Sequence, residues 1–120
     1  MKYKLRPILI ITLALFIQTC SYSKNIELTS TRQPLPQNCE VKVYSPDEGT
    51  PENFEVFATV RFDDAGFSVS CSEDDVKEAM RIEACKIGAN GIIIIKENFP
   101  SLLSTCYRAT AKLVYVQNKP

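Results

Sequence analysis

Four cysteines, spread over the last eighty or so residues, constrain this chain more than any other feature. They are Cys39, Cys71, Cys85 and Cys106, and a fifth, Cys20, precedes them. A domain of about eighty residues has a small core and usually needs cross-links. The gaps between the four cysteines are 31, 13 and 20 residues, whereas zinc ligands come in close C-x₂₋₄-C pairs. We therefore expect two structural disulfides and no metal centre.

Only two of the three possible pairings fit the predicted structure. Cys71 and Cys85 lie fourteen residues apart and bracket a predicted helix, which separates them by about 21 Å. A disulfide requires Cα atoms within about 7 Å, so Cys71–Cys85 is excluded, and Cys39–Cys106 with it. Two pairings stay open, either Cys39–Cys85 with Cys71–Cys106 or Cys39–Cys71 with Cys85–Cys106.

Hydrophobic periodicity predicts a folded domain over residues 39–120. Residues 40–44 alternate before a turn cluster at 45–49, and residues 67–71 suggest another strand. The clearest strand has apolar residues at every second position, namely Phe54, Val56, Ala58, Val60 and Phe62. Ile92–Ile95 lacks polar alternation, as expected of a central strand buried on both faces, and residues 106–116 form the last strand. The expected fold class is α+β, with order β-β-β-α-β-β and one helix packed on a small, mostly antiparallel sheet.

The helix has clear start and stop signals. Ser72 and Asp75 match a capping box, and Gly88 is a suitable stop. The predicted buried face carries Val76, Ala79, Met80, Ala84 and Ile87. Glu83 falls within this face by its spacing, and we expect it to pair with Arg61 or Lys112.

The N-terminal segment has the pattern of an export signal. Three basic residues at positions 2, 4 and 6 precede an apolar run at 8–17 broken only by Thr12. This run has half the roughly twenty residues that a membrane-spanning helix needs. Cys20 follows in Ile17-Gln18-Thr19-Cys20, which resembles the lipobox of bacterial lipoproteins. We expect residues 1–19 to be a signal peptide and Cys20 to carry the lipid, palmitate included. The alternative is cleavage after Ser23, which would release a soluble periplasmic protein.

Residues 20–38 are expected to connect this anchor to the domain. After Cys20 the segment is rich in Ser, Thr, Asn, Gln and Pro, and neither the strand period nor the helix period persists. This composition predicts a flexible tether without regular structure. Eighteen residues of flexible coil span about 25 Å on average.

Composition excludes several classes of function. Fourteen Lys and Arg balance fourteen Asp and Glu, which argues against a nucleic-acid partner. The chain has no histidine, so Ser–His and Cys–His nucleophile pairs and His-ligated zinc cannot form. We identify no catalytic residue and expect neither enzymatic activity nor a cofactor.

Several residues together resemble the RcsF family of outer-membrane lipoproteins, which sense envelope stress. They are Met80-x-Ile82-x-Ala84-x-Lys86, Ala89-Asn90 before an aliphatic strand, Cys106-Tyr107-Arg108, and Cys71 before the helix. The resemblance covers residues 41–116. It implies a Cys71–Cys106 bond, which leaves Cys39 and Cys85 for each other.

The resemblance also implies a location and a mode of action. It places the protein on the periplasmic side of the outer membrane, in a stress response with signal transduction through protein contact upstream of a phosphorelay. The suspected partner is an envelope or inner-membrane signalling protein. This chain departs from the family where the second family disulfide would lie, since residues such as Lys96 and Lys112 stand there. Its tether is also shorter, which weakens the expectation that it threads an outer-membrane barrel.

Two further segments are candidate sites. The loop Phe99-Pro100-Ser101-Leu102-Leu103 is apolar, and Phe99, Leu102 and Leu103 are candidates for partner contact. We expect these side chains instead to fold back over the core. Five acidic residues around the helix start could form a weak cation site, namely Asp63, Asp64, Glu73, Asp74 and Asp75. The position of the last three at the helix N-terminus already explains them. The alternative functions are a periplasmic binding module for a small ligand or metal, and a structural envelope protein.

Overall fold

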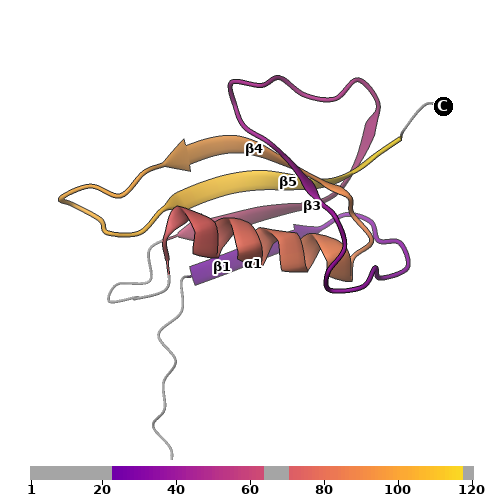
Figure 1. Ribbon diagram of the computed structural model, residues 1–120, viewed down its shortest axis with the longest axis horizontal. Coiled ribbons are helices and arrows are strands. Elements are labelled where there is room, and N and C mark those ends of the chain that lie inside the picture. The colour runs from indigo at the N-terminus through magenta and orange to yellow at the C-terminus, as the bar shows by residue number, and fades with distance from the viewer. Residues whose placement is uncertain (1–22, 64–70, 118–120) are drawn as a thin grey trace, which may run out of the picture.

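The computed structural model describes residues 23–63 and 71–117 as one helix packed on one face of a five-stranded sheet (Figure 1). The elements in chain order are β1 (Ser23–Leu28), β2 (Lys42–Tyr44), β3 (Phe54–Asp63), α1 (Glu73–Lys86), β4 (Gly91–Asn98) and β5 (Arg108–Val116). The strands lie in the order β1-β3-β5-β4-β2. All neighbours are antiparallel except β2 and β4, which are parallel. The predicted α+β class is confirmed.

The predicted order of elements is also found, and the strands predicted at residues 40–44 and 54–62 correspond to β2 and β3, but the third strand before the helix is a different one. The strand expected at residues 67–71 falls largely outside the described residues, and Cys71 itself is not in a strand. An additional strand, β1, lies within the segment expected to be a tether, and it pairs along its whole length with β3. The prediction of a tether without regular structure is therefore wrong for residues 23–28.

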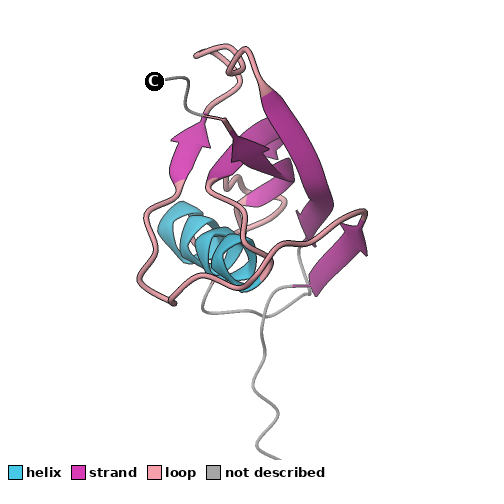
Figure 2. Ribbon diagram, turned by 90° about the vertical axis from the view of Figure 1, so that its right-hand side faces the viewer, coloured by secondary structure: helices cyan, strands magenta, loops and turns pink. Residues whose placement is uncertain are grey.

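The chain after β1 is also fixed to the domain. Residues 29–38, which we call the strap, run along the last turns of α1 (Figure 2). The backbone N–H of Arg32 donates to Ile87 O, and that of Leu35 donates to Cys85 O. The Arg32 guanidinium lies 3.9 Å from the ring centroid of Tyr115. Short polar segments of this kind have no periodicity of their own, because their partners are distant in sequence. The domain consequently begins at β1 and not at Cys39.

The helix forms as predicted. The Ser72 hydroxyl accepts from the Asp75 N–H, and the Asp75 carboxylate accepts from the Ser72 N–H. Gly88 ends the helix with a φ of +79°, a conformation that costs other residues about 1–2 kcal/mol. The residues of α1 buried in the core against the sheet are Val76, Met80 and Ala84, and Cys85 is buried at its bond to Cys39.

A bulge in β3 changes which of its residues are buried. The pairing register of β3 with β5 shifts between Val56 and Ala58, so Phe57 and Ala58 are both buried. Phe54 is 36% exposed and Val56 is half-buried. Strict alternation predicted Phe54 and Val56 in the core and did not include Phe57. That prediction is wrong because one extra residue reverses the alternation on one side of a bulge.

The isoleucine run is interior to the sheet but not its middle strand. Strand β4 lies between β5 and β2, and β5 occupies the centre. Ile92, Ile93 and Ile94 are buried, whereas Ile95 is 50% exposed. A register shift between Ile94 and Lys96 places Ile95 at a second irregularity. Burial on both faces is confirmed for the first three isoleucines only.

Gly88 and Gly49 provide a matched test of the contact between strap and helix. Both have positive φ, but a Cβ on Gly88 would lie 2.8 Å from Gln33 O and 2.9 Å from Arg32 Cβ, whereas one on Gly49 meets nothing within 4 Å. We expect Gly49→Ala to lower the free energy of unfolding by about 1 kcal/mol and Gly88→Ala to lower it by clearly more. Urea unfolding with the disulfides intact measures both. Equal losses would mean that the strap does not press on the end of the helix.

Candidate functional site

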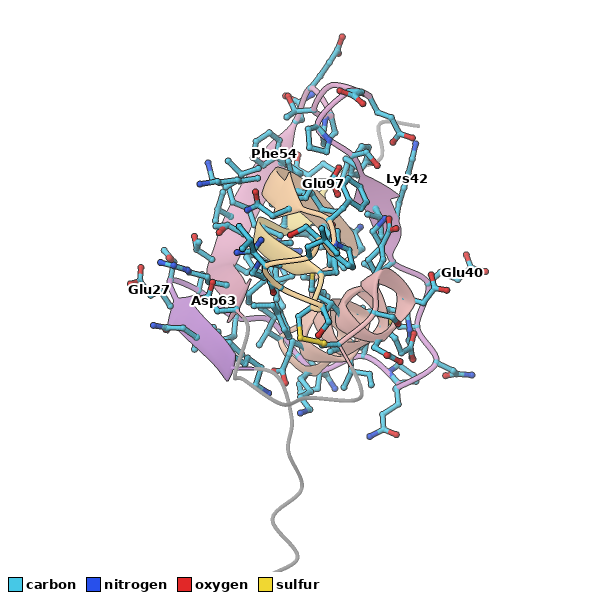
Figure 3. The ribbon with its side chains drawn as sticks, turned by 90° about the vertical axis from the view of Figure 1, so that its left-hand side faces the viewer. Glu27, Glu40, Lys42, Phe54, Asp63 and Glu97 are labelled. Carbon is cyan, nitrogen blue, oxygen red and sulfur yellow. A yellow bond between two sulfur atoms is a disulfide. The ribbon has the colours of Figure 1, made fainter. Side chains whose placement is uncertain are left out.

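One end of the sheet gathers most of the candidate residues from the sequence. Lys24 of β1 pairs with Phe62 of β3, Phe62 with Ala109 of β5, and Ala109 with Glu97 of β4. The start of β1, the end of β3, the start of β5 and the end of β4 therefore lie in one row. We call this the β1-start end. Figure 3 views the molecule from this end, with Asp63 and Glu97 labelled.

The loop between β4 and β5 projects from the β1-start end (Figure 1). Its two leucines have fully exposed side chains, at 106% for Leu102 and 98% for Leu103. Phe99 is 55% exposed and lies 5.5 Å from the Tyr107 ring, between centroids. The expectation that these side chains fold back over the core is wrong for both leucines. Only Phe99 reaches a buried side chain.

The base of this loop is held firmly. Cys106 is bonded to Cys71, and the Tyr107 N–H donates to Cys71 O at 2.9 Å. The Tyr107 side chain is buried, and its hydroxyl donates to Glu97 Oε2 at 2.6 Å. Burial and this hydrogen bond raise the pKa of Tyr107 well above its usual range. The Tyr107 hydroxyl therefore stays protonated and donates its hydrogen bond to Glu97 at the base of the loop.

The disulfides follow one of the two pairings left open by the sequence. They are Cys71–Cys106 and Cys39–Cys85, as the RcsF resemblance implied. The second bond fixes the end of the strap to the helix. The Arg81 guanidinium supports it by donating to Gln37 O at 2.6 Å and to Cys39 O at 3.3 Å.

The structure describes four of the five acidic residues near the helix start, and it does not bring these four together as a cation site. Asp63 pairs with Arg61 at 2.8 Å and Glu73 pairs with Lys77 at 2.6 Å. Asp75 caps the helix, and Asp64 lies outside the described residues. Across residues 23–63 and 71–117, no three potential ligands are close enough to hold a metal ion.

An open groove lies at the opposite end of the sheet, next to the edge strand β2. Its volume is about 850 Å³, and its lining includes Glu40, Lys42, Tyr44, Glu78, Arg81 and Asn90. Asn90 builds one wall, since its side-chain amide donates to Val116 O and accepts from the Val116 N–H. Arg81 lowers the pKa of Glu78 by hydrogen bonding. The sequence did not indicate this groove, because its lining comes from segments that are distant in the chain and that only the parallel pairing of β2 with β4, the Cys39–Cys85 bond and the contacts of Arg81 and Asn90 bring together.

Comparisons of the chain with protein-family models, with curated proteins and with solved structures found no match. In the part of the chain that the structure describes, no helix is long and apolar enough to cross a membrane. Cys20 precedes the described residues.

Glu83 connects the helix to β1 and not to the residues expected. Its carboxylate accepts from Lys24 Nζ at 2.8 Å and from Lys86 Nζ at 3.3 Å, so the predicted pairing with Arg61 or Lys112 is wrong. Partial burial alone would raise the pKa of Glu83, but hydrogen bonds and charge from Lys24 and Lys86 outweigh it, and the pKa is lowered. The Glu83 carboxylate is thus more stable in the folded protein than in the unfolded chain.

The sign of this shift gives a pH-dependent prediction. A lowered pKa contributes stability above the unfolded-state value, and the contribution disappears as the pH falls through the folded-state value, below 4.5. We expect Lys24→Met to cost up to about 1 kcal/mol at pH 7 and progressively less as the pH falls below 4.5. Lys86→Met, within the helix, is the control and should cost less at pH 7. Chemical unfolding at pH 7 and at lower pH measures this. Equal effects of the two variants would show that Lys24 does not attach β1 to the helix.

Proposed function

We propose that this protein is a lipoprotein of the outer membrane, anchored through Cys20 on its periplasmic side, which acts by protein–protein contact. The observation that carries the proposal is the use of the other cysteines. The two disulfides occupy four of the five, so Cys20 is the one outside both bonds. It stands three positions after the last residue of the apolar run, where a lipidated cysteine belongs. Structural disulfides also suit the oxidising periplasm.

The resemblance to the RcsF family gives this contact a purpose, envelope-stress sensing upstream of a phosphorelay. Its support is the Cys71–Cys106 bond, because the residue spacing had left two pairings open. Two residues of the RcsF-like pattern also have structural roles, which supports a fold shared with that family. Asn90 holds the end of β5 through its side-chain amide, and Tyr107 fills the core beside the disulfide.

The short spacer separates this chain from the family pattern. Residues 21 and 22 alone lie between Cys20 and β1, and three backbone steps span at most about 11 Å. The hydrocarbon core of a bilayer is about 30 Å thick. A lipid on Cys20 would therefore keep the domain beside the membrane and prevent the spacer from threading a barrel.

A protein partner would then reach the domain from the end that faces away from the membrane. Gly91 and Asn98 mark the two ends of β4, which lie about 23 Å apart at the usual rise per residue. The groove beside β2 lies at the Gly91 end. It combines acidic and basic side chains with a short edge strand, a surface suited to a polar protein partner.

Intact mass tests the anchor. We expect protein extracted from membranes to have the mass of residues 20–120 plus three acyl chains. Four cysteines should react with an alkylating agent only after reduction, because both disulfides are closed. A lipid-free chain starting near Lys24 would contradict the proposal. The Cys20→Ser variant is the control, and it should remain without lipid.

A reporter strain tests the function. The full chain would be produced in a bacterium that lacks its own stress-sensing lipoprotein and carries a phosphorelay-dependent reporter. We expect the reporter to rise, and Lys42→Glu at the groove to reduce it several-fold, because reversing a charge weakens a complementary contact. Glu27→Lys, a charge reversal on the exposed part of β1, should have little effect. No response from a correctly anchored protein would contradict stress sensing.

A further inference from the structure

The loop at residues 99–103 lies on the same side of the molecule as the proposed anchor. Ser23 starts β1 and pairs with Asp63, and the loop follows Asn98 at the end of β4. Strands β1 and β4 are three positions apart in the sheet, or about 14 Å at the usual spacing. Figure 1 shows the loop as the part of the described chain that extends furthest at this end.

The spacer forces this end toward the bilayer. A lipid on Cys20 and a span of at most about 11 Å from Cys20 to Ser23 leave the β1-start end close to the headgroups. A loop that projects from this end, about 14 Å to the side, would reach the same surface. The chain after Ser23 adds no length to this spacer, because β1 is paired with β3 from its first residue.

The tip of the loop suits insertion into a bilayer. Leu102 and Leu103 are fully exposed, which leaves a concentrated apolar surface in water. Some of the polar backbone groups are already paired, because the Ser101 N–H donates to Ser104 O and the Leu103 N–H donates to the Ser101 hydroxyl. Pairing within the turn lowers the cost of bringing backbone next to lipid.

Basic residues lie at the strand ends that flank the base of the loop. A cleft of about 300 Å³ lies on the face of the sheet that α1 does not cover. Its lining includes Arg61, Lys96, Asn98 and Arg108, and Asp63 supplies a carboxylate. Arg61 pairs with that carboxylate at 2.8 Å. Arg108 Nε is buried with no hydrogen-bond partner among the described groups. Three cations against one carboxylate give this cleft a positive charge beside the loop, which suits phosphate headgroups.

From this arrangement we infer that Leu102 and Leu103 insert into the membrane that holds Cys20. The loop follows β4 and the lipid precedes β1, strands about 14 Å apart in the sheet, and the two attachments together fix the orientation of the domain. Phe99 and Tyr107 support the loop, and the basic cleft meets the headgroups. This inference rests on the proposed lipidation of Cys20, and it assigns the loop to lipid and not to a protein partner.

The absence of tryptophan from the sequence permits a specific probe. The full lipidated protein with Leu102→Trp would be reconstituted into vesicles of phosphatidylethanolamine and phosphatidylglycerol, with or without lipids brominated in the upper acyl chain. The matched control is Phe54→Trp, at the opposite end of β3 and partly exposed. Thermal unfolding should confirm that both variants fold, as position 102 is fully exposed.

We expect blue-shifted emission from Leu102→Trp and quenching by brominated lipid several-fold stronger than for Phe54→Trp. An anchored protein with water-like, unquenched emission at position 102 would overturn the inference and leave the lipid anchor intact. Emission that is shielded only in native outer-membrane vesicles would overturn it in favour of a protein partner. Failure of the protein to float with vesicles would instead refute the lipidation of Cys20, and the inference with it.

Discussion

The Cys71–Cys106 disulfide is the constraint on which the β1-start end depends. It joins the residue before the helix cap to the residue before the buried Tyr107. The start of α1 is thereby fixed to the start of the central strand, and the β4–β5 loop receives a rigid base. Because the base is rigid, the loop can present two leucines to solvent without collapsing onto the core. The second disulfide joins the opposite end of the molecule, where Cys39, the residue after the strap, is bonded to Cys85 of α1.

Local signals predicted the parts of the fold that depend on neighbouring residues. The Ser72–Asp75 capping box and the stop at Gly88 are each local signals, which depend on residues only a few positions apart. The structure has both. Strand β3 was recognised as a strand, but not the residues that it buries, because a bulge is set by the partner strand and not by the pattern of β3 itself. The same reason explains Ile95, which lies at the other register shift.

Long-range pairing explains what the sequence could not predict. Strand β1 is short and polar, and only its position beside β3 reveals it. Glu83 was placed correctly on the buried side of the helix, but its partner Lys24 comes from that unpredicted strand. The apolar loop was found from its composition, whereas its exposure could only come from the structure. The groove beside β2 requires the parallel pairing of segments almost fifty residues apart, and no motif marks it.

The position of β1 at the edge of the sheet has a consequence for aggregation. Strand β3 is ten residues long and carries a run of apolar and β-branched side chains. Without β1, its backbone N–H and C=O groups would form an open edge, a template on which other chains can assemble. With β1 in place, the edge of the sheet is β1 itself, and it carries the polar side chains of Lys24, Asn25 and Glu27. A chain shortened to begin at Cys39 would keep both disulfides, yet it would expose this edge and should self-associate through it.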